Sequence, residues 1–123
     1  MNIIDLNHTA IFVADVEKSK TFYGEKLGLP EMDRPAFNFS GAWFRLGETQ
    51  ELHLIGGRKE AVVSDKRGTH FALQVPDLDA AWEELGSRGV RCFSRQTRPD
   101  GAFQFYVKDP DGYIIEFCQV KNL

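Results

Sequence analysis

The chain has 123 residues, of which 42% are hydrophobic and 27% are charged, and its formal net charge is −3. These values predict one globular domain with its own core, and the scattered basic residues argue against nucleic acid as a partner. No apolar stretch approaches the roughly 20 residues of a membrane-spanning helix, and the start of the sequence lacks the pattern of a signal peptide. The two cysteines are too few for a disulfide framework, so we expect free thiols and a cytoplasmic location.

The first half of the sequence predicts a strand, a helix and three further strands. A strand over 6–14 leads to Asp15, which is a good N-cap for an amphipathic helix that runs to Leu27 and is ended by Gly28. The remaining strands of this half are expected at 36–40, 42–46 and 51–55.

The second half predicts the same order again, after a joint over 56–69 that is rich in glycine and charge. A strand over 70–75 is followed by Asp77, the N-cap of a second amphipathic helix that closes near Gly86. The last strands are expected at 90–93, 103–108 and 113–120, with a polar loop over 94–101 and a turn over 109–112.

An internal duplication relates the two halves. His8 aligns with His70 at an offset that is constant along the first strand and the start of the helix, and His53 aligns with Glu116 after one inserted residue. Each half therefore offers one potential metal ligand on its first strand and one on its last. We predict a single α+β domain over residues 1–123, built from two βαβββ repeats over about 5–56 and 68–120.

The alternation of side chains along the strands places these groups on one face of the sheets. Apolar alternates such as Ile11, Leu52 and Ile115 are expected to pack under the helices, so the other positions face away. The face away from the helices then carries His8, His53, His70 and Glu116. If the two half-sheets curl together, three imidazoles and one carboxylate converge on a site that suits Zn, Ni, Co, Mn or Fe(II).

Two alternatives apply to these candidates. A strand histidine can be an ordinary packed residue, and His53 in particular could lie behind the ligands, leaving two histidines and Glu116 with open positions on the metal. Glu116 is also the candidate catalytic group, because a carboxylate can move a proton. The same alternation selects residues that could line a substrate site: Phe12, Trp43, Arg45, Gln74, Tyr106 and Lys108. Solvated charges and ordinary packing are the competing interpretations for this set.

Three motifs spread over the chain indicate a family resemblance: His8-Thr-Ala-Ile-Phe-Val-Ala-Asp15, Gly68-Thr-His70-Phe-Ala-Leu and Val107-Lys-Asp-Pro-Asp-Gly112-Tyr-Ile-Ile-Glu116-Phe. In these motifs the chain resembles the vicinal oxygen chelate superfamily, which includes glyoxalase I, fosfomycin-modifying thiol transferases, extradiol dioxygenases and bleomycin-binding proteins. The resemblance implies paired βαβββ modules that form a curved open cup of mixed sheet, with helices on the outer face. It also implies a homodimer, and metal ligands at the same four positions.

The sequence departs from this superfamily at His53, where bacterial glyoxalase I carries glutamate. The isomerase reaction of glyoxalase I needs a carboxylate, for which Glu116 remains a candidate base. Glu51, two residues before His53, could substitute for the missing carboxylate, and a solvated residue at the rim is the competing interpretation of Glu51. His8, His70 and Glu116 match both the thiol transferases and the ring-cleaving enzymes. The expected function is a metal-dependent, glyoxalase-like enzyme (lyase or isomerase, thiol transferase or dioxygenase) for a small oxygen-chelating substrate. The alternative is a non-catalytic drug-binding protein of the bleomycin-resistance type.

Overall fold

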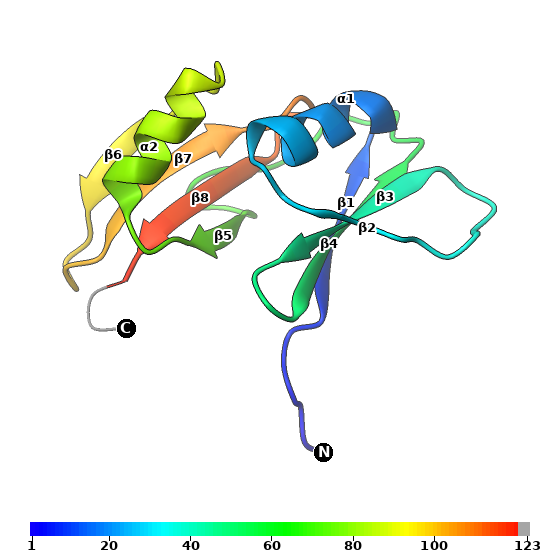
Figure 1. Cartoon of the computed structure of the whole chain (residues 1–123), viewed down its shortest axis with the longest axis horizontal. Coiled ribbons are helices and arrows are strands. Elements are labelled where there is room, and N and C mark those ends of the chain that lie inside the picture. Colours follow the sequence, from blue (N-terminus) through cyan, green and yellow to red (C-terminus); the bar gives the residue numbers. More distant parts are fainter. Residues whose placement is uncertain (121–123) are drawn as a thin grey trace. The chain divides into compact units, whose positions relative to one another are not determined.

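The computed structural model describes residues 1–120, which form two compact units, Met1–Glu60 and a second that begins at Ala61 (Figure 1). Each unit contains one four-stranded mixed sheet, and the order of elements in each is βαβββ, as the sequence predicts. Within residues 1–120, no helix is both long enough and apolar enough to cross a membrane.

The first unit contains one parallel and two antiparallel strand pairs. Its sheet has the spatial order β1-β4-β3-β2, in which β1 runs parallel to β4 and the other pairs are antiparallel. The strands are β1 (His8–Val13), β2 (Glu31–Met32), β3 (Gly41–Leu46) and β4 (Gln50–Gly56). The connection between the parallel strands β1 and β4 contains the helix that the sequence predicts, followed by β2 and β3.

The predicted helix of this unit has the expected ends but a different interior. The Asp15 carboxylate accepts the Lys18 backbone N–H at 3.2 Å, and Gly28 follows the helix with a φ of 77°, the left-handed conformation that glycine tolerates. The single α-helix expected to Leu27 is wrong, because α1 (Val16–Lys20) passes into a π-helix, η1 (Thr21–Lys26). The Leu27 N–H bonds the Phe22 carbonyl at 2.9 Å, which is the five-residue spacing of a π-helix.

The second unit repeats this arrangement with its own sheet, in the order β5-β8-β7-β6 and with β5 parallel to β8. The Asp77 carboxylate caps the helix by accepting the Ala80 N–H at 3.1 Å, as predicted. The elements are β5 (Phe71–Gln74), α2 (Leu78–Ser87), β6 (Phe93–Thr97), β7 (Phe103–Lys108) and β8 (Ile114–Gln119).

Two predicted strands lie elsewhere in the structure. β2 occupies Glu31–Met32 and not 36–40, where a local bond from the Phe37 N–H to the Pro35 carbonyl at 2.8 Å forms a turn. β6 begins at Phe93 and extends through residues that were predicted as a loop. Sequence analysis missed this strand because its polar sequence shows no apolar alternation.

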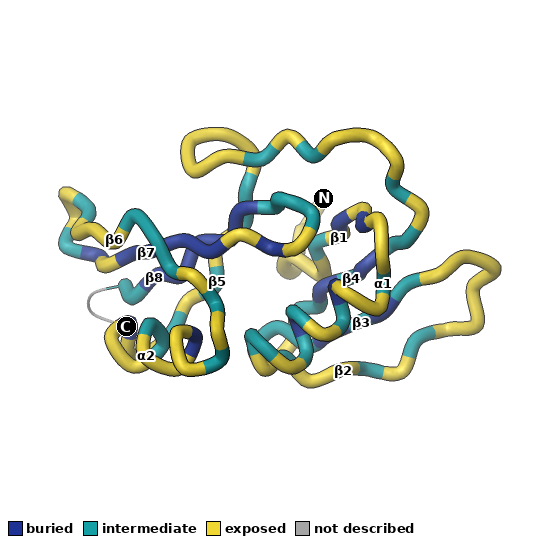
Figure 2. Tube along the Cα trace, turned by 90° about the horizontal axis from the view of Figure 1, so that it is seen from above, coloured by how far each residue is buried: buried dark blue, intermediate teal, exposed yellow. Residues whose placement is uncertain are grey.

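The core of each unit lies between its helix and its sheet. In the first unit the Tyr23 ring meets the Phe44 ring, and in the second the Trp82 ring packs edge-on against Phe105. The predicted helix-side residues of β4 and β8 are buried, including Leu52, Leu54 and Ile115. Figure 2 shows the continuous buried stretches along β7 and β8. The predicted alternation is therefore confirmed for β4, whereas β8 is buried on both of its faces.

Candidate functional site

The first unit places two of the predicted ligands side by side. Ala10 of β1 pairs with His53 of β4, which pairs on its other side with Trp43 of β3. The His53 ring stacks on the Trp43 ring at a centroid distance of 4.0 Å and on the His8 ring at 4.1 Å, with interplanar angles of 2° and 15°. The three rings form one stack, which fixes the plane of the His53 imidazole.

The ring nitrogens of these two histidines have different partners. His8 Nδ1 donates to the Asn7 side-chain oxygen at 2.8 Å, which leaves Nε2 as the atom with the free lone pair. His53 Nε2 lies 2.9 Å from Glu51 Oε1, and the other oxygen of this carboxylate, Oε2, lies 3.7 Å from the Arg45 guanidinium. Because a carboxylate only accepts, Nε2 of His53 carries the hydrogen. His8 is thus oriented as a ligand, whereas His53 is already engaged by Glu51.

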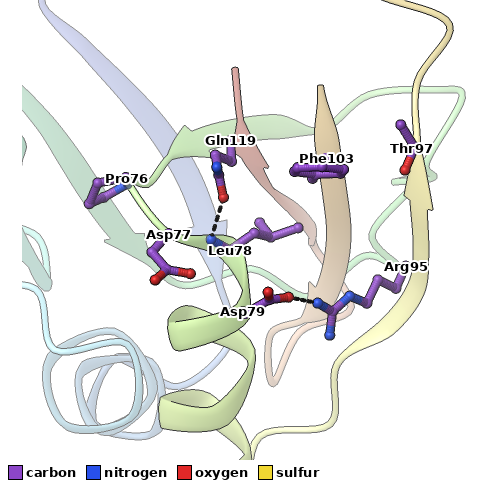
Figure 3. A pocket seen from close by; sticks show the side chains of 8 residues that line it. All are labelled: Pro76, Asp77, Leu78, Asp79, Arg95, Thr97, Phe103 and Gln119. Carbon is purple, nitrogen blue, oxygen red and sulfur yellow. Dashed lines mark hydrogen bonds and ion pairs between the residues drawn. The ribbon is translucent and has the colours of Figure 1, made fainter. Parts of the chain in front are cut away.

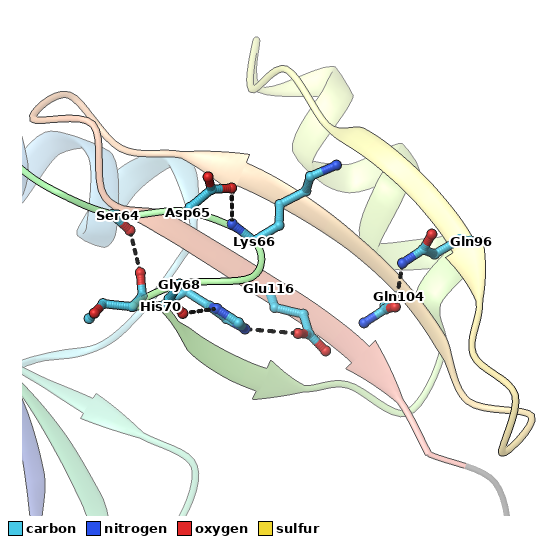
Figure 4. Close-up of polar contacts among 9 residues, drawn as sticks. Ser64, Asp65, Lys66, Gly68, His70, Gln96, Gln104 and Glu116 are labelled. Carbon is cyan, nitrogen blue, oxygen red and sulfur yellow. Dashed lines mark hydrogen bonds and ion pairs between the residues drawn. The ribbon is translucent and has the colours of Figure 1, made fainter.

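The second unit repeats this pattern with different side chains. Ala72 of β5 pairs with Glu116 of β8, which pairs in turn with Tyr106 of β7. The His70 Nε2 atom lies 3.2 Å from Glu116 Oε1, and the two side chains point toward one another (Figure 4). The Tyr106 ring packs edge-on against His70 at 6.0 Å. The alignment of His53 with Glu116 predicted from the duplication is therefore visible in the strand registers.

His70 faces an oxygen acceptor at each ring nitrogen. Its Nδ1 lies 3.2 Å from the Gly68 carbonyl oxygen, and its Nε2 faces the Glu116 carboxylate, whose side chain is only 8% exposed. A neutral imidazole has one N–H, so donation to Gly68 leaves the Nε2 lone pair directed at a carboxylate. A proton or a metal ion between these two atoms removes that conflict. Histidines that bind metals characteristically donate their other nitrogen to a carbonyl, and the Gly68 carbonyl offers His70 Nδ1 this acceptor. The pair therefore fits a metal ion.

Burial sets the protonation of Tyr106 and the two cysteines. Burial raises the pKa of the Tyr106 hydroxyl above its ordinary value, and the Glu116 charge and a hydrogen bond with that carboxylate raise the pKa further. Tyr106 therefore keeps its proton at neutral pH, and its hydroxyl donates a hydrogen bond to the Glu116 carboxylate. Burial also raises the pKa of the thiols of Cys92 and Cys118, so neither thiol is activated as a thiolate.

The remaining substrate candidates have mixed surroundings. The Phe12 ring is exposed, whereas the Arg45 guanidinium forms an ion pair with Glu51. Gln74 and Lys108 are exposed strand residues, and neither makes a hydrogen bond or ion pair with His70 or Glu116 within residues 1–120. Trp43 and Tyr106 are candidates whose rings contact predicted ligands, His53 and His70 respectively.

The predicted ligands are divided between the units, with His8 and His53 in the first and His70 and Glu116 in the second. Across residues 1–120, no group of three or more His, Cys, Asp or Glu side chains is arranged to hold a metal ion. The convergence of all four ligands therefore stays a prediction.

Sequence analysis missed several groups that position this chemistry. Asn7 orients His8, and the Gly68 carbonyl orients His70. The available signal in the sequence was that Asn7 directly precedes one histidine and Gly68 lies two residues before the other. Lys66 and Ser94, which are bonded to one another near Tyr106, gave no signal because they are far apart in sequence.

A pocket of about 480 Å³ lies at the start of α2, away from these groups (Figure 3). Gln119 accepts the Leu78 N–H there at 2.8 Å, and Arg95 forms an ion pair with Asp79. The pocket is lined by none of the predicted ligands or substrate residues, so it forms no part of the predicted site.

The fold and its side chains define an α+β protein of duplicated βαβββ modules, with a histidine at the start of one strand and a carboxylate on its neighbour in the second module. The chain belongs to the Glyoxalase/Bleomycin resistance protein/Dioxygenase superfamily, whose family model matches residues 5–117. This membership confirms the resemblance and the fold class predicted from the sequence.

Three similar proteins illustrate the range of functions in this superfamily. The chain is 33% identical to glutathione transferase FosA of Serratia marcescens, over 90% of this chain and 77% of that protein. It is 30% identical to lactoylglutathione lyase of Salmonella typhimurium, over 95% and 93% of the two chains. The crystal structure of TnmS3, an antibiotic binding protein from Streptomyces sp. CB03234, matches with a TM-score of 0.81 and 28% identity, over 98% and 99% of the two chains.

Proposed function

We propose that the chain is a metal-dependent, glyoxalase-like enzyme that acts on a small oxygen-chelating substrate. His8, His70 and Glu116 would hold the ion, with His53 as a fourth ligand or as a neighbour behind the site. The observation that supports this proposal most directly is the His70–Glu116 pair, since the imidazole Nε2 and a buried carboxylate oxygen face one another at 3.2 Å. A divalent ion in such a site supplies Lewis-acid polarisation of substrate oxygens. A homodimer stays a prediction, as does a cytoplasmic location.

The chain's own residues would position the substrate and move its proton. Glu116 is the proposed proton carrier, because it is buried and lies next to the proposed substrate position. The Tyr106 hydroxyl donates to Glu116 and holds this carboxylate in one orientation. In the first unit Glu51, at 2.9 Å from His53, supplies a second carboxylate that an isomerase reaction could use. The similar lyase and glutathione transferase support a lyase, isomerase or thiol-transfer reaction, and the superfamily also includes dioxygenases.

The experiment that tests this proposal is elemental analysis of the protein purified without a histidine tag. We expect close to one divalent ion per chain, because the proposal assigns His8, His70 and Glu116 to a single ion. The identity of the ion then selects the assay: Ni, Co or Zn for isomerase or lyase chemistry, Mn for thiol transfer and Fe for ring cleavage. Absence of bound metal, even after reconstitution with each of these ions, would contradict the proposal.

A non-catalytic drug-binding protein is the second candidate, because the chain is similar to an antibiotic binding protein. Exposed aromatic rings on the first unit also favour it, since Phe37 and Phe39 stack on one another at 4.9 Å while each remains more than two-fifths exposed. Such rings suit a flat apolar ligand. A metal-free protein that binds flat aromatic compounds would support this candidate over the enzyme.

The His53→Glu variant is expected to change metal affinity and metal preference roughly tenfold, if His53 is a ligand. The substitution places a carboxylate two residues from Glu51, and the repulsion between the two should lower the stability of the metal-free protein. Added metal should restore that stability, and a thermal unfolding series with and without each ion measures both effects. The neutral His53→Gln variant is the control for loss of the ring stack. Unchanged metal affinity and preference in His53→Glu would show that His53 is not a ligand.

A further inference from the structure

The pocket at the start of α2 lies on the face of the second sheet against which this helix packs. Phe103 pairs with Thr97 on one side and with Gln119 on the other, so these three side chains lie in a row across β6, β7 and β8 (Figure 3). Phe105, two residues later on the same face of β7, packs against Trp82 of α2. Phe103 continues this core face but remains 45% exposed, so it forms an apolar floor for the pocket.

Three polar side chains that line the pocket retain unused hydrogen-bonding groups. The Gln119 side-chain oxygen accepts the Leu78 N–H at 2.8 Å, whereas the two hydrogens of its amide nitrogen have no acceptor within residues 1–120. The Thr97 hydroxyl has no hydrogen-bond partner in the same part of the chain. Asp77 Oδ1 accepts the Ala80 N–H at 3.1 Å, which leaves Oδ2 as a further acceptor. The pocket therefore offers donors and an acceptor beside an aromatic floor.

The charged groups of the pocket are already compensated by the protein. The Arg95 guanidinium forms an ion pair with Asp79 (Figure 3) and lies 5.0 Å from the centre of the Trp82 ring. Asp77 caps α2, where the partial positive charge of the helix N-terminus stabilises a carboxylate. An anionic ligand would have to compete with Asp79 for Arg95, and a cationic one would have to compete for the two carboxylates. A neutral ligand meets neither form of competition.

We propose that this pocket is a second small-molecule site and that it binds a neutral aromatic carboxamide. The ligand ring stacks on Phe103, its carbonyl oxygen accepts from the Gln119 amide, and its NH2 group donates to Asp77. The volume of about 480 Å³ is that of an ordinary ligand pocket. Strand alternation places Glu116 and Gln119 on opposite faces of β8, so the sheet separates this pocket from the proposed metal site. The pocket therefore adds a binding function to the proposed one and shares no residue with it.

Titration of the protein with benzamide, followed by the backbone amide resonances, tests this site. We expect saturable shifts at Leu78, Phe103 and Gln119, and weaker binding of benzoate, benzylamine and cyclohexanecarboxamide, which alter the charge or the aromatic ring. The Phe103→Ala variant should bind benzamide about tenfold more weakly, since it loses the stacked ring. Gln119→Glu should also weaken binding, because it removes the two N–H donors and keeps the oxygen that accepts the Leu78 N–H.

The matched control is Phe39→Ala, which removes a ring of similar exposure, 44% against 45%, from the first unit. Its affinity for benzamide should equal that of the wild-type protein, and circular dichroism checks that each variant is folded. Equal affinities in Phe103→Ala and the wild-type protein would overturn the site, as would shifts confined to the first unit or the absence of saturable binding. Tighter binding of benzoate or benzylamine than of benzamide would overturn the assigned ligand class. Metal content is measured separately, so this proposal and the proposed function can fail independently.

Discussion

The His70→Ala variant is expected to lose metal affinity by more than about a hundredfold while keeping its fold. Loss of a group that merely orients a metal ligand lowers metal affinity by up to about a hundredfold, so loss of a ligand itself should lower it further. His70 lies at the start of β5 and is not part of the buried core, so the substitution leaves the packing under α2 in place. Elemental analysis and a competition titration with a metal chelator measure the affinity, and circular dichroism measures the fold.

The matched control for this variant is Gln74→Ala. Gln74 is an exposed residue of β5, and within residues 1–120 it forms no hydrogen bond or ion pair with His70 or Glu116. We expect its metal content to equal that of the wild-type protein. A His70→Ala protein that retains its metal and loses stability would mean that His70 is a structural residue, whose contact with Glu116 serves packing alone.

The features of the fold that the sequence predicts correctly are those with a local physical signal. Asp15 and Asp77 precede helices as caps because each can accept a backbone N–H of the first turn, and both bonds are present. β4 was predictable because Leu52 and Leu54 alternate with polar residues, so one face of the strand must be buried. The repeat then transferred this information to the second unit.

The features that sequence analysis missed depend on tertiary structure. β6 consists mostly of polar residues, so its pairing with β7 leaves no pattern of alternation. The π-helical turn at η1 has the same composition as an α-helical one, because the two differ in hydrogen-bond spacing and not in residue type.

The candidate site divides in the same way. The His70–Glu116 contact follows from strand alternation and the repeat, and both could be recognised in the sequence. The Lys66–Ser94 contact depends on a bulge and on a turn tied to another strand, which no short motif records. The convergence of the two histidines of the first unit on this pair stays a prediction, which the metal measurements test.

The Phe105→Ala variant is expected to lower the free energy of unfolding by about 3–5 kcal/mol, as large-to-small substitutions of buried aromatic residues do. Phe105 is fully buried, stacks on Phe117 at 5.2 Å and meets Trp82 edge-on at 5.3 Å. It joins α2 to the two central strands of the second sheet and precedes Tyr106. Urea unfolding followed by far-UV circular dichroism measures the loss.

Phe103→Ala is the control, because Phe103 lies two residues earlier on the same strand and is 45% exposed. Truncation of a residue this exposed should change the free energy of unfolding by less than about 1 kcal/mol, since it leaves no buried cavity. Equal losses in the two variants would mean that Phe105 does not anchor the core.

The unfolding curve also tests the proposed single domain, because one shared transition requires the unit that starts at Ala61 to unfold together with Met1–Glu60. If Phe105→Ala instead divides the curve into two transitions, the units fold separately and the single-domain proposal is wrong.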